Sequence, residues 1–569
     1  MNAFLSSHTL ALTPLSPIHI GCGEDFEPTN YVIEDGLLYG FDPSRAALTE
    51  LQRNKLGAAA RSGSLAGIQK FFRDNAAAFK PHAHVVMPVA KGVASQYEKR
   101  LGEAANWESS GRTVFNQLEI ERHVFTGPLQ QPFIPGTSFK GALRTAWLDE
   151  LNGGRDPRDV EFKYNGEAKS TTRMETTLLG GDFQTSPLRL LKVADLMPTR
   201  EPEREVLFAV NRKKRMPKDG EAPPKGVTAR KDCVLHGQYR LFQAGVTLPA
   251  LLTHVGATDG KNKPLTPQRN LLNAHGAVDL PALARQSNAY HRQRLQRELA
   301  VLGGRGLVNP DWKRGIDALL APQGELDQKL KAGQAFLIRL GRYGGADNKT
   351  LTGEGVASIK IMGAKGEKPT FESTTKTVWL AAQFETDQKH LIPFGWAVVE
   401  IDPTSDCKSL QNWCTTQAQG RPNMAVKRAA LQAERQAAIV QRAQQAAEAA
   451  QRAAAAEAER LAAEQRAQAL LQMSPHAQQV ETLRQVCEDL TKKLPPHGNF
   501  KKQAPDANKP GLYKDAAALT KTALESPDWS AADKAALADM LEAWLPKVIA
   551  PWEPKEQRKK LKFAALRGQ

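Results

Sequence analysis

The segment that most constrains the fold of this chain runs from Phe133 to Thr145, where a short apolar run passes through a Pro-Gly turn into a helical pattern. A helix that starts near Thr137 or Ser138 has unpaired amides and a partial positive charge at its first turn, and these favour an anion such as phosphate. Lys140 and Arg144 lie four residues apart and therefore share one helical face. A hydroxyl-capped helix with a solvated basic face explains this spacing equally well.

Two further motifs contain glycine after an apolar run. The first, Leu15 to Glu24, includes His19 and ends in Gly21-x-Gly23, which is a weak signal by itself. The second lies far downstream, where the run from Phe336 enters Gly341-Arg342-Tyr343-Gly344-Gly345. A strand that leads into a glycine-rich loop with basic and aromatic residues can wrap a phosphodiester backbone and offer a ring to a base. A flexible hairpin loop is the alternative interpretation.

The glycine-rich loop does not match the common nucleotide-binding motifs. It lacks the Gly-x-x-x-x-Gly-Lys-Ser/Thr pattern of a P-loop. It also lacks the Gly-x-Gly-x-x-Gly spacing of a dinucleotide fingerprint and the acidic residue expected about 20 positions later. The sequence therefore excludes both of these sites.

The motifs at Leu15–Glu24 and Phe133–Thr145 together resemble the RAMP superfamily of CRISPR-associated RNA-binding proteins. The family pattern reads Ser-Pro-x-His-Ile-Gly-x-Gly, then Ile-Pro-Gly-Ser-Ser-Leu-Lys-Gly-x-x-Arg; here Thr137 and Phe139 replace a serine and a leucine. The glycine-rich loop and the stretch Leu391–Glu400 extend the resemblance over about residues 8–402. Within the superfamily, the chain is most similar to the fifth-subunit family of the type III-A (Csm) effector complex, which caps the spacer-derived 3′ end of the guide RNA.

The resemblance implies an α+β fold with one or two ferredoxin-like (RRM-like) modules. It also implies a non-catalytic subunit that binds guide RNA (crRNA), caps its 3′ end, and supports complex assembly and crRNA maturation in antiviral defence. The implied partners are the crRNA, the neighbouring RAMP backbone and small helical subunits, and host trimming nucleases. The residues expected to contact RNA are His19, Gly21, Gly23, Gly136, Ser138, Lys140, Gly141, Arg144, Arg339, Gly341, Arg342, Tyr343, Gly344, Gly345 and Lys349.

The composition agrees with this interpretation without establishing it. The chain has 569 residues, and its 77 basic against 61 acidic side chains give a formal charge of +16, which favours a polyanionic partner. Its 5 cysteines form no Cys-x-x-Cys pair, so we expect neither a metal nor a disulfide framework, and no cofactor. No apolar stretch is long enough for export or a membrane span, and a cytoplasmic location is expected.

The pattern along the chain divides it into four parts. Residues 1–240 and 241–405 are predicted to form an N-terminal RAMP region and a C-terminal RAMP region with the glycine-rich loop. A strand pair is expected at 205–210 and 233–241, joined by a connector that contains the basic run Arg212 to Arg215. Residues 423–473 are alanine-rich and predict a long exposed helix, and residues 474–569 predict a small helical domain with a basic tail.

Two other functions remain open from the residues alone. One is a metal-independent endoribonuclease that processes CRISPR transcripts, for which His19 is the natural base and Asp182 and Asp195 are possible loop carboxylates. A histidine within an apolar strand is more often a hydrogen-bonded structural residue. The other is a structural adaptor whose basic charge is incidental.

Overall fold

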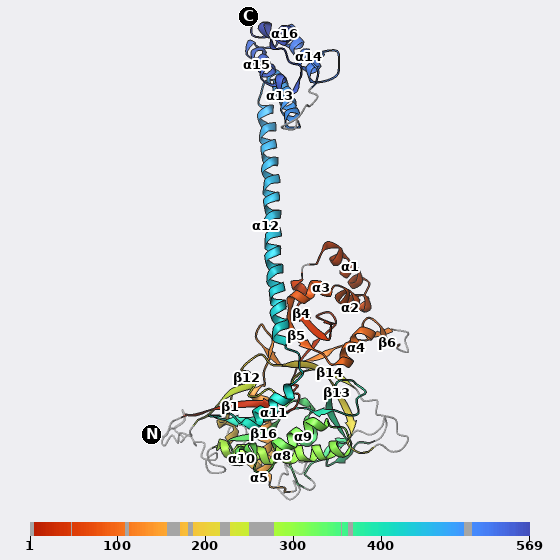
Figure 1. Cartoon of the computed structure of the whole chain (residues 1–569), viewed down its shortest axis with the longest axis vertical. Helices are drawn as coiled ribbons and strands as arrows, with labels where there is room; N and C mark the ends of the chain where they lie inside the picture. The colour runs from red at the N-terminus through yellow and green to blue at the C-terminus, as the bar shows by residue number, and fades with distance from the viewer. Residues whose placement is uncertain are drawn as a thin grey trace, which may run out of the picture. The chain divides into compact units, whose positions relative to one another are not determined.

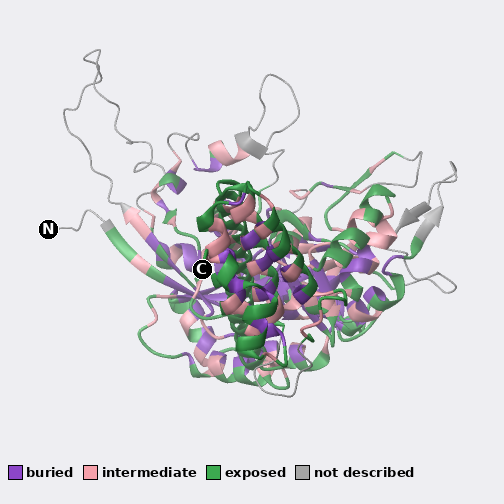
Figure 2. Ribbon diagram, turned by 90° about the horizontal axis from the view of Figure 1, so that it is seen from above, coloured by how far each residue is buried: buried purple, intermediate pink, exposed green. Residues whose placement is uncertain are grey.

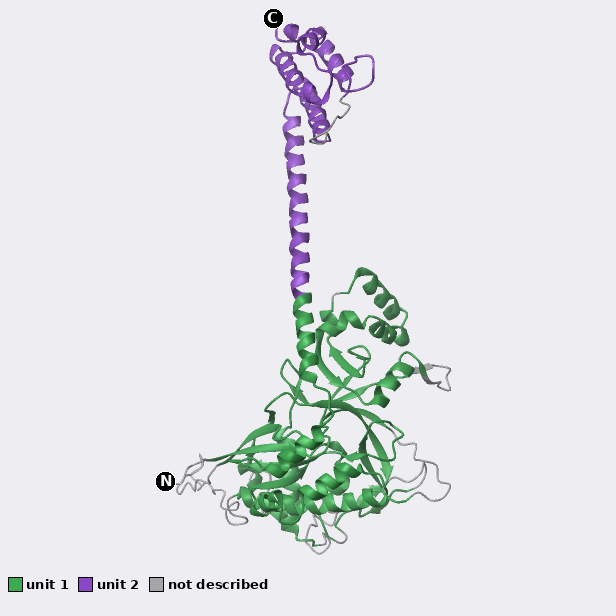
Figure 3. Cartoon of the chain, in the orientation of Figure 1, with its two compact units in different colours: residues 1–438 green, residues 439–569 purple. Residues whose placement is uncertain are grey.

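The computed structural model divides the chain into two units, residues 1–438 and residues 439–569 (Figure 3). The first unit combines helices and strands, and the named elements of the second are all helices. The expected mixture of helix and sheet is therefore confirmed, while the ferredoxin-like module stays a prediction. The structure describes residues 5–46, 48–107, 113–155, 171–179, 186–216, 228–249, 278–353, 356–361, 368–493 and 503–569.

Two six-stranded sheets form the centre of the first unit. The first sheet has the order β11-β15-β1-β21-β16, with β12 also paired to β15. Its strands β1, β12 and β16 are labelled in Figure 1. Its central strand is held in register on both sides, because Leu10 lies opposite Ala244 and opposite Ile401. The strands are β1 (Leu5–Pro14), β11 (Lys192–Val193), β12 (Met197–Pro198), β15 (Phe242–Pro249), β16 (Ala335–Arg339) and β21 (Trp396–Ile401).

The second sheet has the order β2-β8-β14-β13-β19-β20. Its longest strand, β13, contains the unbroken buried run Val206 to Val210, as expected for a strand covered on both faces. The β14 and β8 strands are parallel, and the other pairs are antiparallel. The strands are β2 (Gly21–Phe26), β8 (Ile120–His123), β13 (Arg204–Lys213), β14 (Ala229–Val234), β19 (Thr377–Ala382) and β20 (Ile392–Pro393).

Both sheets combine strands from the two predicted RAMP regions. In the first, β1 pairs with β15 and β21; in the second, β13 pairs with β19. A boundary at residue 240 would assign these paired strands to different regions, although they lie side by side in the same sheet. The division into modules therefore stays a prediction.

The strand predicted at 233–241 is wrong in its extent. β14 ends at Val234, and β15 begins only at Phe242. Between them Gly237 and Arg240 have φ angles of 70° and 46°, which turn the chain out of the sheet.

The Asp35-Gly36 pair in the sequence predicts a two-residue hairpin turn. This hairpin lies in a three-stranded sheet of β3 (Tyr31–Glu34), β4 (Leu37–Phe41) and β5 (Ala83–Pro88). Asp35 and Gly36 have φ angles of 50° and 72°, as the expected two-residue turn requires. Phe41 stacks on Phe79, with ring centroids 4.7 Å apart. The helices that follow in this part of the chain are α1 (Glu50–Arg61), α2 (Leu65–Asp74), α3 (Ala76–Phe79) and α4 (Lys91–Arg100).

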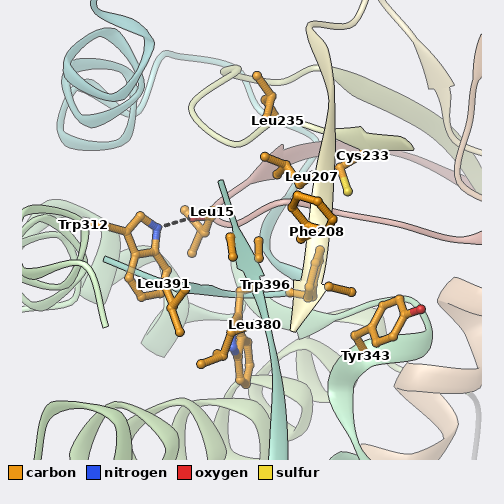
Figure 4. Packing of buried hydrophobic residues seen from close by; sticks show 14 of the residues in the cluster. Leu15, Leu207, Phe208, Cys233, Leu235, Trp312, Tyr343, Leu380, Leu391 and Trp396 are labelled. Atoms are coloured by element: carbon orange, nitrogen blue, oxygen red, sulfur yellow. Dashed lines mark hydrogen bonds between the residues drawn. The ribbon is translucent and has the colours of Figure 1, made fainter. Parts of the chain in front are cut away.

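The helices α8 (Leu280–Gly304), α9 (Pro310–Leu319) and α10 (Glu325–Ala332) contribute to the largest core of the first unit. Trp312 of α9 is buried there, and its indole nitrogen donates to the Leu15 carbonyl at 2.7 Å (Figure 4). Trp396 of β21 is also fully buried. The other helices in this unit are α5 (Gly136–Asn152), α6 (Thr171–Leu179) and α11 (Lys408–Ala418). The short strands are β6 (Ala104–Trp107), β7 (Thr113–Phe115), β9 (Phe125–Thr126), β10 (Gln131–Pro132), β17 (Ile359–Ile361) and β18 (Thr370–Glu372).

The alanine-rich segment forms one helix, α12 (Met424–Leu471). Only Met424 of this helix is buried, so the helix is exposed along almost all of its length. The buried residues of the chain are coloured purple in Figure 2. The second unit has its own core, which includes Trp529, Leu541 and Phe563. Its helices after α12 are α13 (Pro475–Lys492), α14 (Leu512–Glu525), α15 (Ala531–Val548), α16 (Pro554–Lys560) and α17 (Phe563–Leu566). No helix among the described residues has an apolar stretch that would cross a bilayer.

Candidate nucleic-acid interface

The three motifs singled out in the sequence share one hydrophobic core. Phe139 of α5 packs against Phe336 of β16, with ring centroids 6.0 Å apart. The apolar residues of the motifs that belong to this cluster are Ile18, Ile20, Ile134, Phe139, Leu143, Phe336, Ile338 and Leu340. Segments far apart in the sequence are therefore fixed together by burial, which positions the polar and glycine residues that flank them.

The glycine-rich loop is in direct contact with the first motif. Gly341 has a φ of +85°, and a Cβ atom there would lie 2.3 Å from the carbonyl oxygen of His19. Both the conformation and the contact require glycine. Gly395 fits in the same way against the Leu340 carbonyl, and its amide donates to Pro17 at 2.9 Å. The loop, the first motif and the Leu391–Glu400 stretch thus form one interlocked unit.

His19 lies inside this unit and is only 1% exposed. Its Nδ1 donates to the Asp232 carbonyl at 2.8 Å, which leaves Nε2 as the unprotonated nitrogen. Nε2 is 3.6 Å from Glu121 Oε1. Burial lowers the pKa of His19 to about 4, so the ring is neutral at physiological pH. His19 therefore connects β14 to the first motif.

Glu121 of β8 joins the first motif to the glycine-rich loop. It forms an ion pair with the buried Lys231 and another with Arg342 at 3.3 Å. Gly21 leaves room for it, because a Cβ there would lie 2.6 Å from Glu121 Oε1. Burial, and then the charge of Arg342, lower the pKa of Lys231 to about 8. Arg342 itself is 71% exposed at its side chain, so it extends positive charge to the surface.

A buried ion pair lies behind this cluster. Asp232 is fully buried and accepts from the Arg204 guanidinium and from the His123 amide. Burial opposes ionisation of Asp232, but the charge of Arg204 outweighs it and lowers the pKa. Burial lowers the pKa of His123 to about 4. The charges of Asp232 and Arg204 therefore neutralise each other and connect β14 to β13.

The helix α5 begins at Gly136, with Pro135 as its N-cap and no side-chain cap. The Gly136 amide donates to the Asp195 carboxylate at 2.8 Å. The helix start is therefore capped by a carboxylate that is distant in the sequence, and not by a local hydroxyl as the sequence alternative proposed. A Cβ at Gly136 would lie 2.7 Å from the Val193 carbonyl. Asp195, considered above as a loop carboxylate, thus anchors the helix start. Asp182 lies outside the described residues.

The basic face of α5 is accessible. Arg144 is exposed and lies 3.3 Å from Glu175. Lys140 is partly buried, and burial together with the neighbouring Lys192 lowers its pKa. Ser138 is also partly exposed on the first turn. Gly141, between the two cations, has nothing within 4 Å of where a Cβ would lie.

The predicted contact residues of the glycine-rich loop differ in accessibility. Arg342 and Lys349 are exposed, and Gly345, with a φ of +72°, has open space around it. Tyr343 is only 8% exposed and packs on Phe394, with centroids 5.1 Å apart. Burial raises the pKa of Tyr343 to about 12. Most of this ring is therefore engaged within the protein.

Arg339 is buried beside the loop. Its guanidinium donates to the Phe394 carbonyl at 2.9 Å and to Glu298 at 3.0 Å. It also lies over the Trp396 ring at 4.8 Å. In this structure the Arg339 side chain is enclosed by protein groups beside the loop. Its contact with RNA stays a prediction.

A cavity of about 1440 Å³ opens on the other side of the loop. Its wall includes residues of the loop between Tyr343 and Asn348, residues of α8 between Arg294 and Leu302, and the segment from Glu372 to Trp379. Seven of the side chains that line it are basic and three are acidic. The basic ones are Lys213, Lys214, Arg215, Arg294, Arg297, Lys360 and Lys376; the acidic ones are Glu298, Asp347 and Glu372.

The basic run of the β13–β14 connector lies partly in the sheet. Arg212 is buried, and its guanidinium donates to the Asp387 carbonyl. Lys214 forms an ion pair with Asp347 of the glycine-rich loop. Residues 217–227 of this connector lie outside the described residues.

Several residues of the site were not anticipated from the sequence. Glu121, Lys231 and Asp347 carry no motif, and only the three-dimensional contacts show that they organise the loop. A weak signal existed in β14, because the three consecutive charged residues Arg230, Lys231 and Asp232 directly precede the apolar pair Cys233-Val234. Among the described residues, no group of three or more His, Cys, Asp or Glu side chains gathers as metal ligands would.

Comparison with known proteins shows which class of protein the chain resembles. A sequence model of the RAMP superfamily matches residues 11–259, which include the first motif, α5 and the β13–β14 pair. The resemblance to this superfamily of CRISPR-associated proteins is therefore confirmed.

Within that class the chain is similar to Csm5 of type III-A systems. The Csm5 protein of Mycobacterium tuberculosis (strain CDC 1551 / Oshkosh) is 29% identical over 176 residues, which are 28% of this chain and 43% of that protein. Csm5 of Methanocaldococcus jannaschii is 22% identical over 205 residues, 32% of this chain and 40% of that protein. The chain thus spans about two fifths of the length of the curated relatives it matches.

Two solved structures also match at low similarity. The crystal structure of T. onnurineus Csm5 aligns with a TM-score of 0.39 and 16% identity, and covers 68% of this chain and 99% of that one. A chain of the Csm-crRNA-target RNA ternary complex of a type III-A CRISPR-Cas system aligns with a TM-score of 0.37 and 15% identity, and covers 69% and 100%.

Proposed function

We propose that this chain is a non-catalytic guide-RNA-binding subunit of a type III CRISPR effector complex. In this proposal it caps the 3′ spacer end of the crRNA and supports complex assembly and crRNA maturation. Its partners are the crRNA and the neighbouring RAMP backbone and small helical subunits; host trimming nucleases act on the guide before it is capped.

The observation that carries the proposal is a difference between two sets of glycines. In each motif one glycine is crowded by protein atoms, while another has no described atom within 4 Å of its Cβ position. Packing explains the crowded glycines, and left-handed φ angles of +82° and +72° explain Gly23 and Gly345. Neither reason applies to Gly141, which has helical backbone geometry. The crowded set is Gly21, Gly136 and Gly341, and the open set is Gly23, Gly141 and Gly345.

Gly141 is the most informative of the open glycines. It lies inside the helix α5, where glycine costs about 0.8–1.0 kcal/mol relative to alanine. No neighbour in the described structure compensates for this cost. Lys140 and Arg144 flank it on the same helix, so a ligand that approaches the bare backbone at Gly141 meets positive charge. A phosphodiester backbone has the shape and the charge for this surface.

The surface suits a guide because it contacts backbone rather than base edges. Arg342, Lys349 and the α5 cations can bind phosphates without reading sequence. A guide RNA needs its bases free to pair with a target, so its carrier must hold it mainly through phosphate and sugar.

The environment of His19 argues for binding rather than cleavage. Its Nδ1 is committed to the Asp232 carbonyl, and its Nε2 is enclosed beside Glu121. A general base needs access to the hydroxyl that it deprotonates. At 1% exposure His19 has none in this structure.

The test of RNA binding is a salt titration of the full chain with labelled single-stranded RNAs of unrelated sequence. Affinity should be similar across sequences and should fall linearly with the logarithm of salt concentration. A salt-independent affinity would identify the chain as a structural adaptor. Incubation of labelled repeat RNA with the chain, followed by a denaturing gel, tests the processing nuclease; cleavage would refute the non-catalytic assignment.

The capping role needs a reconstituted effector. A valine at Gly344 would place its Cβ 3.3 Å from the Arg339 side chain. A valine at Gly345 would put a branched side chain at a φ of +72°, which such residues resist. We expect this variant to drop out of the complex or to leave the guide 3′ end open to trimming. Normal incorporation with an unchanged distribution of guide 3′ ends would show that this loop does not hold the 3′ portion.

A further inference from the structure

We propose that the cavity of about 1440 Å³ beside the glycine-rich loop binds a short single-stranded segment of RNA. This inference rests on the proposed RNA-binding function and extends it to a defined site away from the α5 surface. The cavity is formed by α8, the loop that follows β16, and the segment that leads into β19.

The charge of the cavity favours a polyanion. Its three carboxylates are already neutralised: Glu298 pairs with Arg339, Asp347 with Lys214, and Glu372 with Lys376. Arg297 and Lys360 are both exposed on the wall, and the described residues give neither of them an ion pair. Their charges are therefore available to a ligand.

The remaining basic side chains include one that is held in place. The Arg294 guanidinium lies 3.3 Å from the centroid of the Tyr290 ring and donates to the carbonyls of Asp347 and Thr350. Burial lowers the pKa of Arg294. Its cation is thus fixed at the boundary between α8 and the loop, which orients positive charge without any motion on binding.

The size of the cavity favours an extended ligand. Small-molecule pockets usually measure about 300–1,000 Å³. A cavity of about 1440 Å³ exceeds that range. A run of several nucleotides, whose phosphates repeat along the chain, would place charge near both Arg297 on α8 and Lys360 on β17.

The aromatic wall favours nucleotides over an acidic peptide. Tyr343 and Trp379 both line the cavity, with ring centroids 5.4 Å apart. Trp379 is only partly buried, so part of its ring remains accessible. Stacking on an aromatic ring requires an unpaired base, whereas the bases of a duplex are stacked on one another. The site should therefore select single strands.

The frame of the cavity is fixed by Asp347. Its carboxylate accepts from the amide and the hydroxyl of Thr375 at 2.9 and 2.6 Å and pairs with Lys214. These contacts connect the glycine-rich loop to β13 and to the segment before β19. A site built this way is formed before the ligand arrives, which limits the entropic cost of binding.

The experiment compares two double variants of the full chain that change the net charge equally. The cavity variant is Arg297→Glu with Lys360→Glu. The control is Arg285→Glu with Lys55→Glu, which reverses one exposed charge on the same helix α8 and one on α1, both outside the cavity. Thermal unfolding verifies that both variants are folded.

We expect the cavity variant to bind single-stranded RNA about tenfold more weakly than the control. Its salt slope should fall by about 1.4, since each single-strand phosphate contact contributes about 0.7. A blunt RNA duplex should bind the cavity variant and the control equally. The proposal would be overturned if both variants bound single-stranded RNA equally weakly. It would also be overturned if the parent chain bound the duplex more tightly than the single strand.

A crosslinking measurement identifies the occupant. RNA that carries 4-thiouridine should crosslink to peptides containing Tyr343 or Trp379 in the parent chain and lose these crosslinks in the cavity variant. Poly-glutamate that competes for the cavity as well as RNA does would assign it to an acidic peptide and overturn the proposal. If the parent binds no RNA at all, the proposed function itself is refuted; if it binds RNA without crosslinks in the cavity, only the cavity assignment fails.

Discussion

Replacement of Gly141 by alanine should make the chain more stable and a weaker RNA binder. The residue lies inside α5, and an added Cβ would meet no described atom within 4 Å. The full difference in helix propensity between glycine and alanine, about 0.8–1.0 kcal/mol, should therefore appear as increased stability. Equilibrium unfolding in urea measures it as a higher midpoint with an unchanged m-value.

The effect on RNA should grow with the size of the added side chain. Leucine is also a good helix former, so Gly141→Leu should keep the stability while its side chain holds a ribose or phosphate away from the helix. We expect a modest loss of affinity for Gly141→Ala and a loss of about tenfold for Gly141→Leu, which corresponds to about 1.4 kcal/mol.

Gly57 provides a matched control. It lies inside α1, and its nearest neighbour would be the end of the Arg61 side chain at 3.4 Å. Gly57→Ala and Gly57→Leu should raise stability similarly and leave RNA affinity unchanged. Affinity of Gly141→Leu within twofold of the parent, in a salt-controlled titration, would refute the argument that the bare backbone at Gly141 faces RNA.

Three further outcomes are expected. Lys140→Ala with Arg144→Ala should weaken binding to unrelated RNA sequences alike and shallow the salt slope by about one to two; an unchanged slope in a folded variant would remove α5 from the interface. His19→Ala and the parent should both leave labelled repeat RNA intact on a denaturing gel, and metal-independent cleavage by the parent that the substitution abolishes would favour the nuclease. Burial lowers the pKa of His291 to about 3, so the unfolded chain takes up a proton below about pH 6.5 that the folded chain does not. Stability should therefore fall as the pH drops from about 6.5 toward 3, and His291→Phe should reduce that slope by about 1.4 kcal/mol per pH unit in urea titrations at each pH.

The sequence predicted the elements whose local signals are strong. The Asp35-Gly36 turn, the start of α5 beside Pro135 and the helix over the alanine-rich segment all follow from short-range preferences of the backbone. The sequence was misleading at residues 235–241, which were predicted to continue a strand. There Gly237 and Arg240 turn the chain out of the sheet. Periodicity cannot show that a run of suitable residues is bent by contacts elsewhere.

Pairing between distant strands was beyond local reasoning. The β1 strand pairs with β15 and β21, which follow it by more than two hundred residues in the sequence, so regions predicted as successive parts form common sheets. In the second sheet, the pairing of β8 with β14 places Glu121 opposite Lys231, and Arg342 of the loop forms an ion pair with the same glutamate. None of these three has a neighbour in the sequence that would indicate the ion pairs.

The glycines show most clearly what the sequence leaves undecided. The family resemblance implies that both Gly136 and Gly141 contact RNA. The structure separates them, since the Val193 carbonyl already occupies the space at Gly136 and nothing described occupies it at Gly141. A glycine that its own protein needs for packing is explained within the fold. A glycine that costs helix stability and is left open indicates a partner from outside the chain, and beside Lys140 and Arg144 that partner should carry negative charge.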